Sequence, residues 1–339
     1  MTKLEVSPRL LVSQTLSFDL PGRVPRQLWL LPWAYDHFPD EVNRIRLRFP
    51  DDIISAPGFF QKQPVTQGNP YAIGTYIDEW GCIFENCQQG VIGEVKQPVI
   101  PTWDGLDLLR PPLEALTVDV DQVNAFCKQS DKFILAGCCP RPFERLQFLR
   151  TSHNLFIDIA ENSASFKSLL QKVHDFYLKE LELWAKTKVD ALSFMDDWGA
   201  QRSLLISPKL WRQIFKPLYK EYIELAHSYG KYIFMHSDGY IADIIPDLVE
   251  LGLDALNSQL FTMDIEALGR EFSGKITFWG EIDRQHILPS PDTRLASEAV
   301  KRIKTAFWKD GGCIAQCEFG AGARPENVWT VFETWEKLL

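Results

Sequence analysis

The sequence predicts an α/β protein folded as a single (β/α)8 TIM barrel, and two observations predict it. Short apolar, β-rich runs alternate with amphipathic helical stretches along the chain, which is typical of helices that cover a parallel sheet. The 339 residues are 45% hydrophobic, enough to bury the large core that such a barrel needs. Because no repeat, linker or low-complexity segment divides the chain, we expect one domain over residues 1–339.

The second half of the chain shows the alternation most clearly. Glycines follow several of its apolar helical stretches, as is typical of helix ends. The predicted helices are Phe166–Lys188, Pro208–Tyr229, Ile241–Glu250, Ile265–Phe272, Arg294–Lys309 and Pro325–Leu339. The predicted strands are Ala191–Met195, Tyr232–Met235, Ala255–Asn257, Ile276–Trp279 and Cys313–Cys317.

The first half is less regular. Gln27–Leu31 and Phe133–Ala136 have the composition of barrel strands. Between about Pro57 and Pro101 the chain is rich in Gly, Pro and Gln and shows no clear periodicity. Because a long excursion of this kind usually covers a site, we predict an irregular active-site insertion in this N-terminal part.

The net charge and the hydropathy of the sequence limit the partners and the location that we expect. The net charge of −9 gives no excess of basic residues to neutralise phosphates, so we expect no binding to nucleic acid or to an anionic membrane. No uncharged apolar run of about 18 residues and no secretory signal is present, which predicts a cytoplasmic protein. The seven cysteines are then expected to be reduced thiols. Whether the chain forms a homodimer is left open by the sequence.

Each of the five late strands ends in polar residues. Carboxyl ends of barrel strands meet at one rim, so these residues are expected to face one cavity. Polar residues after a strand also occur simply because exposed loops follow strands, which would explain any single case. Five in succession favour a shared site. They are Asp196-Asp197, His236-Ser237-Asp238, Asn257-Ser258-Gln259, Glu281-Ile282-Asp283 and Gln316-Cys317-Glu318.

Three of these side chains form a candidate metal site. His236 and Asp238 are two residues apart at a strand end, so their side chains project to the same side, and Cys317 at another strand end closes the set. An imidazole, a carboxylate and a thiolate with one open position suit catalytic zinc. Alternatively, His236 is a hydrogen-bonded histidine that orients a carboxylate or acts as a general acid or base.

The insertion holds a second acidic segment, Asp78-Glu79-Trp80-Gly81. Adjacent carboxylates in a dry pocket cannot both ionise cheaply, so one of them is expected to donate a proton. For Glu79, and for Asp196 in the other acidic pair, a loop ion pair or a helix cap is the alternative. We predict catalytic roles for Asp78, Glu79, Asp197 and Glu281. We predict substrate contacts for Trp80, Trp198, Asn257 and Gln259, with packing at the rim as the alternative for the two tryptophans.

Four segments of the sequence resemble a known family. They are Asp19-Leu-Pro-Gly-Arg-Val-Pro-Arg26, Ser207-Pro208 with Phe215-Lys-Pro217, His236-Ser-Asp-Gly239, and Arg324-Pro-Glu-Asn-Val328, the most specific of the four. With them the chain resembles, over almost its whole length, the uroporphyrinogen decarboxylase superfamily, which includes cobamide-dependent methyltransferases. The resemblance implies a (β/α)8 barrel.

The methyltransferase branch of that superfamily implies a function. Its zinc ligands, a His-x-Cys pair and a distant Cys, correspond to His236, Asp238 and Cys317, with an aspartate in place of the middle cysteine. The resemblance therefore implies zinc-assisted methyl transfer between a small methylated substrate or a thiol and a corrinoid. The sequence has no Asp-x-His-x-x-Gly corrinoid-binding signature, so the corrinoid is expected on a separate protein.

The decarboxylase branch gives the alternative function. A metal-free decarboxylase would use Asp78, which corresponds to that branch's catalytic aspartate, on a tetrapyrrole or another carboxylated substrate. The Met-Arg-Gln-Ala-Gly-Arg stretch that binds carboxylates in that branch has no counterpart here, and a cysteine stands where that branch has a histidine. A scaffold that has lost its chemistry is a third hypothesis, which the many polar strand ends disfavour.

Overall fold

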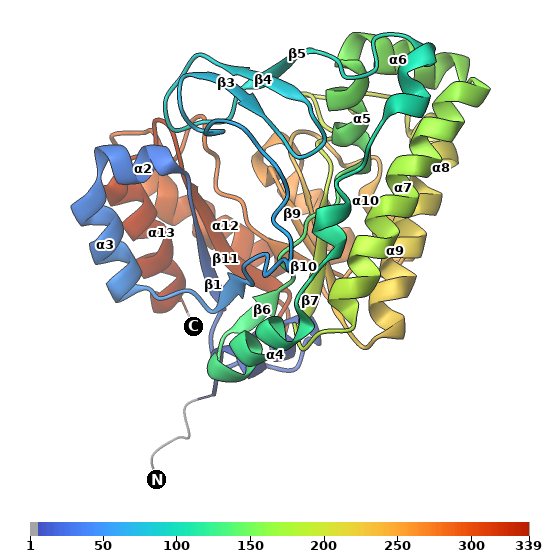
Figure 1. Ribbon diagram of the computed structural model, residues 1–339. Helices are drawn as coiled ribbons and strands as arrows, with labels where there is room; N and C mark the ends of the chain where they lie inside the picture. Colours follow the sequence, from blue (N-terminus) through green and yellow to red (C-terminus); the bar gives the residue numbers. More distant parts are fainter. Residues whose placement is uncertain (1–5, 339) are drawn as a thin grey trace.

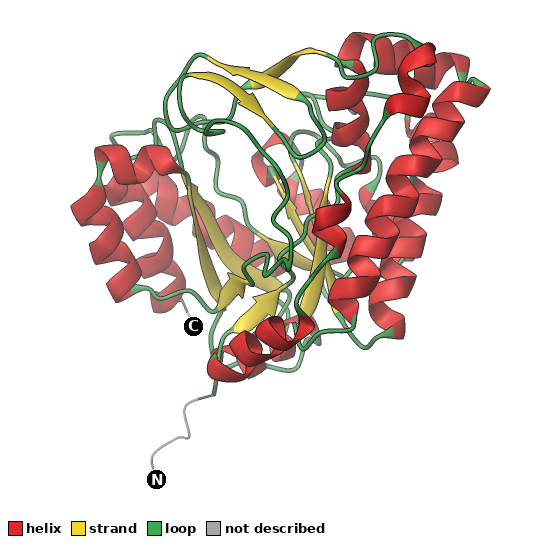
Figure 2. Ribbon diagram, in the orientation of Figure 1, coloured by secondary structure: helices red, strands yellow, loops and turns green. Residues whose placement is uncertain are grey.

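The computed structural model describes residues 6–338 and confirms the predicted TIM barrel. Eight parallel strands form one sheet in the order β1-β11-β10-β9-β8-β7-β6-β2, and helices surround it (Figures 1 and 2). The termini of the predicted domain, residues 1–5 and 339, lie outside the described residues. The barrel strands are β1 (Arg26–Leu30), β2 (Ile53–Ser55), β6 (Phe133–Leu135), β7 (Ala191–Met195), β8 (Tyr232–Ser237), β9 (Ala255–Ser258), β10 (Thr277–Trp279) and β11 (Cys313–Phe319).

Hydrogen bonds from the residues just before β2 join it to β1 and nearly close the barrel. The backbone N–H of Asp52 donates to the carbonyl of Arg26 at 2.8 Å. The carboxylate of Asp52 accepts from the N–H of Arg26 at 2.9 Å, and that of Asp51 accepts from the N–H of Leu28 at 2.6 Å. Two side chains therefore satisfy strand N–H groups that a regular ladder would otherwise pair.

Thirteen α-helices and three short 3-10 helices lie within the described residues. The helix predicted over 208–229 is in fact two helices that meet at Phe215, because Pro217 has no N–H and cannot lie inside a continuous helix. The α-helices are α1 (Pro8–Leu16), α2 (Pro32–His37), α3 (Pro39–Arg48), α4 (Val120–Gln129), α5 (Pro142–Arg150), α6 (Ser152–Glu161), α7 (Ala164–Ala185), α8 (Pro208–Ile214), α9 (Lys216–Ser228), α10 (Ile245–Glu250), α11 (Ile265–Phe272), α12 (Arg294–Phe307) and α13 (Pro325–Lys337). The 3-10 helices are η1 (Trp103–Leu108), η2 (Leu113–Leu116) and η3 (Leu260–Thr262). None of the helices in this part of the chain is long and apolar enough to cross a membrane.

Large side chains fill the interior of the barrel. Phe234 of β8 stacks on Phe133 of β6 and lies edge-on to Trp279 of β10, with ring centroids 5.8 and 5.0 Å apart. Val12 and Leu16 of α1 join the same buried cluster. The barrel interior is therefore filled by side chains, with α1 packed against them. Space for a ligand is expected at the carboxyl ends of the strands.

The insertion is more ordered than predicted. Within the segment expected to be irregular, the chain forms a three-stranded antiparallel sheet of β3 (Gly74–Ile77), β4 (Ile83–Asn86) and β5 (Glu94–Gln97), at the top of Figure 1. Asp78, which follows β3, forms an ion pair with Arg145 of α5, the helix that follows β6. The insertion sheet is thus held near the carboxyl ends of the barrel strands.

Candidate active site

Two glycines bring the loops after β7 and β8 into backbone contact. A Cβ atom on Gly199 would lie 2.3 Å from the carbonyl carbon of Gly239, and Gly239 has a φ of +78°. The N–H of Gly199 donates to the carbonyl of Asp238 at 3.0 Å, and the N–H of Asp238 donates to the carboxylate of Asp197 at 2.9 Å. Only glycine permits this approach and this backbone conformation, which place Asp197 beside Asp238.

His236 of β8 points between these two carboxylates. Its Nε2 atom lies 3.5 Å from an oxygen of Asp197 and 3.6 Å from Oδ1 of Asp238. The three residues form the one group of at least three metal-ligand side chains found among the described residues. Burial lowers the pKa of His236, but the carboxylates of Asp238, Asp197 and Glu281 outweigh it, so the pKa is raised.

Asn257 of β9 fixes the orientation of the His236 ring. The amide nitrogen of Asn257 donates to the carbonyl of Trp279, which leaves its Oδ1 atom to accept from Nδ1–H of His236 at 2.6 Å. The proton of a neutral His236 is then on Nδ1, and the lone pair of Nε2 faces the two carboxylates. Asn257 therefore positions the histidine, a role that differs from the substrate contact predicted for it.

Replacing Asn257 with leucine is expected to weaken divalent-cation binding about 10- to 100-fold, because the ring of His236 loses the acceptor that sets its tautomer. Calorimetric titration of the metal-free variant with Zn²⁺ would measure the change. Ser258→Ala is the matched control, because Ser258 is equally buried on β9 and its hydroxyl has no hydrogen-bond partner. Equal Zn²⁺ affinity in wild type and Asn257→Leu would contradict the assigned role.

Cys317 does not belong to this group, which corrects the predicted ligand set. Along β11, Ile314 packs in the barrel interior and Glu318 pairs with Arg284, whereas Cys313 and Cys317 belong to the core outside the barrel. Side chains alternate between the two faces of a strand, so Cys317 points away from the mouth that Glu318 faces. Burial raises the pKa of the Cys317 thiol well above its ordinary value.

Arg284 ties together the acidic residues on the other side of the mouth. Its guanidinium lies 2.6 Å from Asp238, 3.3 Å from Glu281 and 3.0 Å from Glu318. Burial, with Asp238 and Glu318 nearby, raises the pKa of Glu281 to about 8, although Arg284 opposes this shift. One buried oxygen of Asp238 and one of Glu281 have no hydrogen-bond partner. Gln259 accepts a hydrogen bond from the N–H of Gly239 and so holds the loop after β8.

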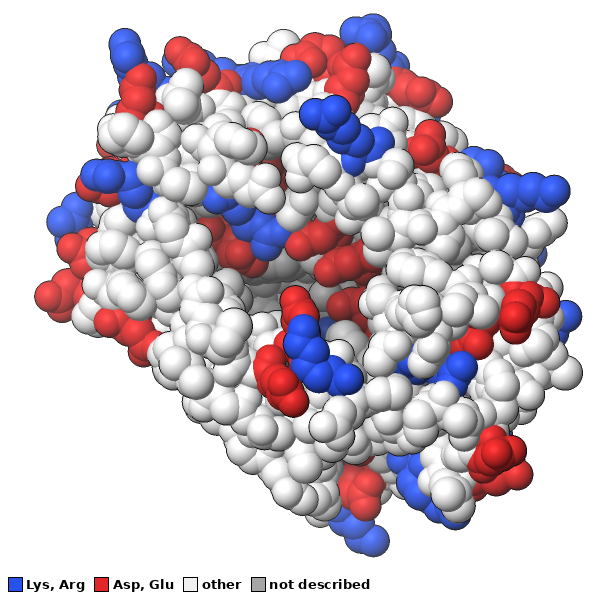
Figure 3. All heavy atoms as spheres, turned by 90° about the horizontal axis from the view of Figure 1, so that it is seen from above, with Lys and Arg blue, Asp and Glu red and all other residues white. Residues whose placement is uncertain are grey.

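A cavity of about 640 Å³ lies between the insertion sheet, α5 and α7. Seen from above, the molecule is hollowed near the centre of this face, and acidic and basic side chains line the hollow (Figure 3). Asp78, Glu79 and Trp80 all contribute to the cavity wall, as does Arg145. This separates the predicted catalytic residues into two sets, with Asp78 and Glu79 at the cavity, and Asp197 and Glu281 at the mouth of the barrel.

Asp78 and Glu79 are held by Arg145. Asp78 accepts hydrogen bonds from the N–H groups of Trp80 and Cys82 with one oxygen, and pairs with Arg145 through the other. Glu79 lies 3.1 Å from the same guanidinium, whose centre is 5.0 Å from the Trp80 ring. Asp78 is thus fully engaged in ordering the insertion, and Glu79 forms the loop ion pair given above as its alternative role.

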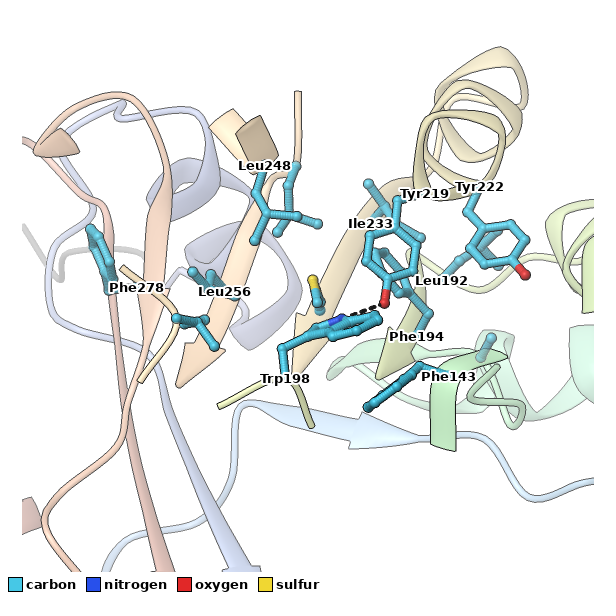
Figure 4. Close-up of a cluster of buried hydrophobic side chains, with 14 of the residues drawn as sticks. Phe143, Leu192, Phe194, Trp198, Tyr219, Tyr222, Ile233, Leu248, Leu256 and Phe278 are labelled. Atoms are coloured by element: carbon cyan, nitrogen blue, oxygen red, sulfur yellow. Dashed lines mark hydrogen bonds between the residues drawn. The ribbon is translucent and has the colours of Figure 1, made fainter. Parts of the chain in front are cut away.

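Trp198 lies in the core, so its predicted contact with substrate is not supported. Its side chain is fully buried and stacks on Phe143 at a centroid distance of 4.0 Å. Its indole N–H donates to the hydroxyl of Tyr219 at 2.7 Å, as Figure 4 shows. Tyr219 in turn donates to Asp196, whose carboxylate also accepts from the first N–H groups of α5. Trp198 therefore belongs to the packed side chains between α5 and the end of β7.

Sequence reasoning missed charged residues of the cavity wall, among them Arg141, Glu144, Arg145 and Glu180. The first three follow β6, a strand that was recognised, in the segment Pro140-Arg-Pro-Phe-Glu-Arg145. Scanning the end of this earlier strand as well as the five late strands would have found them. Glu180 lies inside the long helix α7 and gives no comparable signal, because acidic residues are common on helices.

Comparisons with known structures agree with the fold. A methyltransferase from Methanosarcina mazei superposes with a TM-score of 0.67 at 14% sequence identity, covering 98% of this chain and 99% of that chain. A B12-independent methionine synthase from Shewanella sp. W3-18-1 gives a TM-score of 0.45 at 13% identity, covering 65% of each chain. At these identities the first likeness shows a shared fold, and the second is too distant to carry an argument.

Sequence comparison is more specific about the family. No curated protein matches the chain significantly. The family model of uroporphyrinogen decarboxylase (URO-D) matches residues 70–338, well over half of the chain and all of the region that carries the site. The chain therefore belongs to the uroporphyrinogen decarboxylase family.

Proposed function

We propose that the protein is an enzyme that transfers a methyl group between a small substrate and a corrinoid carried on a separate protein, assisted by a zinc ion held by Asp197, His236 and Asp238. The observation that carries the proposal is the convergence of these three side chains at the carboxyl end of the barrel. The family, and the likeness of the whole chain to a protein named as a methyltransferase, support it.

The donor set fits a divalent cation. Nε2 of His236 is free to bind a metal because Nδ1 donates to Asn257. Oδ1 of Asp238 is buried without a hydrogen-bond partner, as a ligand atom would be before a metal is bound. Imidazole nitrogen and carboxylate oxygen are both established zinc ligands, and three protein ligands leave a position open for substrate. Without the Cys317 thiolate the set is harder, so Mn²⁺ is also expected to bind.

A bound cation supplies Lewis acidity at the open position. The residues of the chain do the rest. Arg284 holds Asp238 and Glu281 in place. Glu281, with a pKa of about 8, carries a proton at neutral pH that it can donate to a leaving group.

Metal-free decarboxylation is the second candidate, and the family name favours it. It would need Asp78 to contact the substrate. Both oxygens of Asp78 are already engaged by backbone N–H groups and by Arg145. A substrate would have to displace a buried ion pair to reach this carboxylate, so we place decarboxylation second.

Metal analysis combined with an assay would test the proposal. We expect about one equivalent of Zn²⁺ in the wild type and in Cys317→Ser, and much less in Asp238→Asn. We expect the zinc-loaded protein to methylate cob(I)alamin, seen as a change in its visible spectrum, from a member of a panel of methylated oxygen, nitrogen and sulfur compounds. Loss of zinc in Cys317→Ser, or carbon dioxide release by metal-free protein, would overturn it.

A further inference from the structure

We propose that the cavity beneath the insertion sheet binds an aromatic carboxylate, with the guanidinium of Arg141 as the anchor for the carboxylate group. The binding site rests on the residues of the cavity wall. The further statement that this ligand is the substrate rests on the proposed function.

Arg141 is the unused cation of the cavity wall. Within residues 6–338, no carboxylate oxygen lies within 4.0 Å of its guanidinium, and its side chain forms no hydrogen bond. Arg145, the other arginine of the wall, is saturated by Asp78, Glu79 and the hydroxyl of Tyr177. A guanidinium presents planar donors that match a carboxylate, so an anionic ligand of the cavity would be bound by Arg141.

The neighbouring acids do not pair with this cation. Glu144 is the acid whose charge acts most strongly on Arg141, but no oxygen of Glu144 lies within 4.0 Å of the guanidinium. Glu180, deeply buried on α7, has its pKa raised to about 8, mainly by burial and also by Glu79, so it is neutral at pH 7. A neutral carboxyl can donate its O–H to a ligand carboxylate beside Arg141. The first N–H groups of α5, at Phe143 and Glu144, are already bonded to Asp196. These groups of the helix N-terminus therefore do not compete for the anion.

The rest of the wall suits a flat apolar body. Phe60, Trp80, Phe84, Phe148 and Phe176 contribute aromatic surface to the cavity. Its volume of about 640 Å³ lies within the range of about 300–1,000 Å³ that is usual for small-molecule sites. Aromatic ligands pack well against aromatic walls, so a ring that carries one carboxylate matches both parts of the cavity.

The cavity adjoins the cation site, by which we mean the side chains of Asp197, His236 and Asp238. Glu144 lines the cavity and lies close enough to Asp197 and His236 for their charges to act on its carboxyl group. Asp196, which accepts from the N–H of Glu144, is the residue before Asp197. A ligand anchored at Arg141 and extending past Glu144 would therefore direct its far end toward Asp197, His236 and Asp238.

Direct binding to the full-length protein tests the site. Benzoate is the probe, and benzamide is its neutral isostere. We expect calorimetry to show benzoate binding to the wild type, and Arg141→Met to weaken it about 10- to 100-fold. Benzamide is expected to bind weakly and equally to both proteins. Arg294→Met, which removes an exposed positive charge elsewhere, is expected to leave benzoate binding unchanged.

Two further measurements separate the possible failures. Arg141→Met should keep the zinc content and the thermal midpoint of the wild type, so that weaker binding is not a sign of unfolding. Arg141→Lys should recover part of the benzoate affinity through its charge. Equal benzoate affinity in wild type and Arg141→Met, or equal affinity of the wild type for benzoate and benzamide, would overturn the site. Benzoate binding without any methyl transfer would contradict the proposed function while the site stands.

Discussion

Replacing His236 with alanine is expected to remove zinc from the protein and to lower kcat of methyl transfer about 1,000-fold. His236 supplies the single nitrogen ligand of the proposed zinc site. Without it, Asp197 and Asp238 would offer only oxygen ligands. The Lewis acidity of a metal is worth several kcal/mol of transition-state stabilisation, and about 4 kcal/mol corresponds to this factor. Metal content by mass spectrometry and steady-state rates would check both parts.

His153→Ala is the control for this experiment, because His153 is exposed and outside the site. It is expected to retain zinc and activity. The metal hypothesis would be wrong if His236→Ala kept a full equivalent of zinc. If the variant lost zinc but kept its rate, the cation would be structural and the proposed mechanism would be abandoned.

Replacing Arg145 with methionine is expected to lower the free energy of unfolding by about 3–5 kcal/mol, because it leaves the buried carboxylate of Asp78 without its partner. Both side chains are almost fully buried, at 6% and 5% exposure. The variant also loses the contact between the guanidinium and the Trp80 ring. Urea unfolding monitored by circular dichroism would measure the change.

Two variants make this test specific. Arg48→Met breaks an exposed ion pair with Glu336 and is expected to cost no more than about 1 kcal/mol. Adding Asp78→Asn to Arg145→Met removes the unpaired charge and keeps an oxygen that can accept from Trp80 and Cys82, so it should recover part of the loss. A double variant less stable than either single variant would show that charge pairing is not the cause.

The sequence predicted the second half of the barrel well because its strands are buried on both faces and its helices carry one apolar face. Ala191–Met195 and Ile265–Phe272 have the predicted bounds. The three-residue strand β2 is too short to show a period, and its pairing to β1 depends on Asp51 and Asp52 outside it. The insertion sheet was missed because turn residues interrupt its strands every few positions.

Convergence of the late strand ends was the part of the site that sequence could predict. Asp197, His236 and Glu281 lie at one mouth because parallel strands end on the same side. Cys317 lies outside this group because a strand has two faces, and the motif alone does not say which face a residue occupies. Contacts across the molecule, such as those of Trp198 and Arg145, depend on packing between segments distant in the sequence.

The contact between Gly199 and Gly239 fixes the two loops that carry Asp197 and Asp238, whereas other parts of the site can change in sequence. No side chain fits between the two loops, so neither loop can be redesigned without moving both acidic residues of the cation site. The cavity wall, in contrast, is built largely from the insertion and from α5 and α7. Substitutions in the cavity wall can change which ligand shapes the cavity accepts without moving Asp197, His236 or Asp238. New substrate preferences of this protein should therefore be sought in residues other than Asp197, His236 and Asp238.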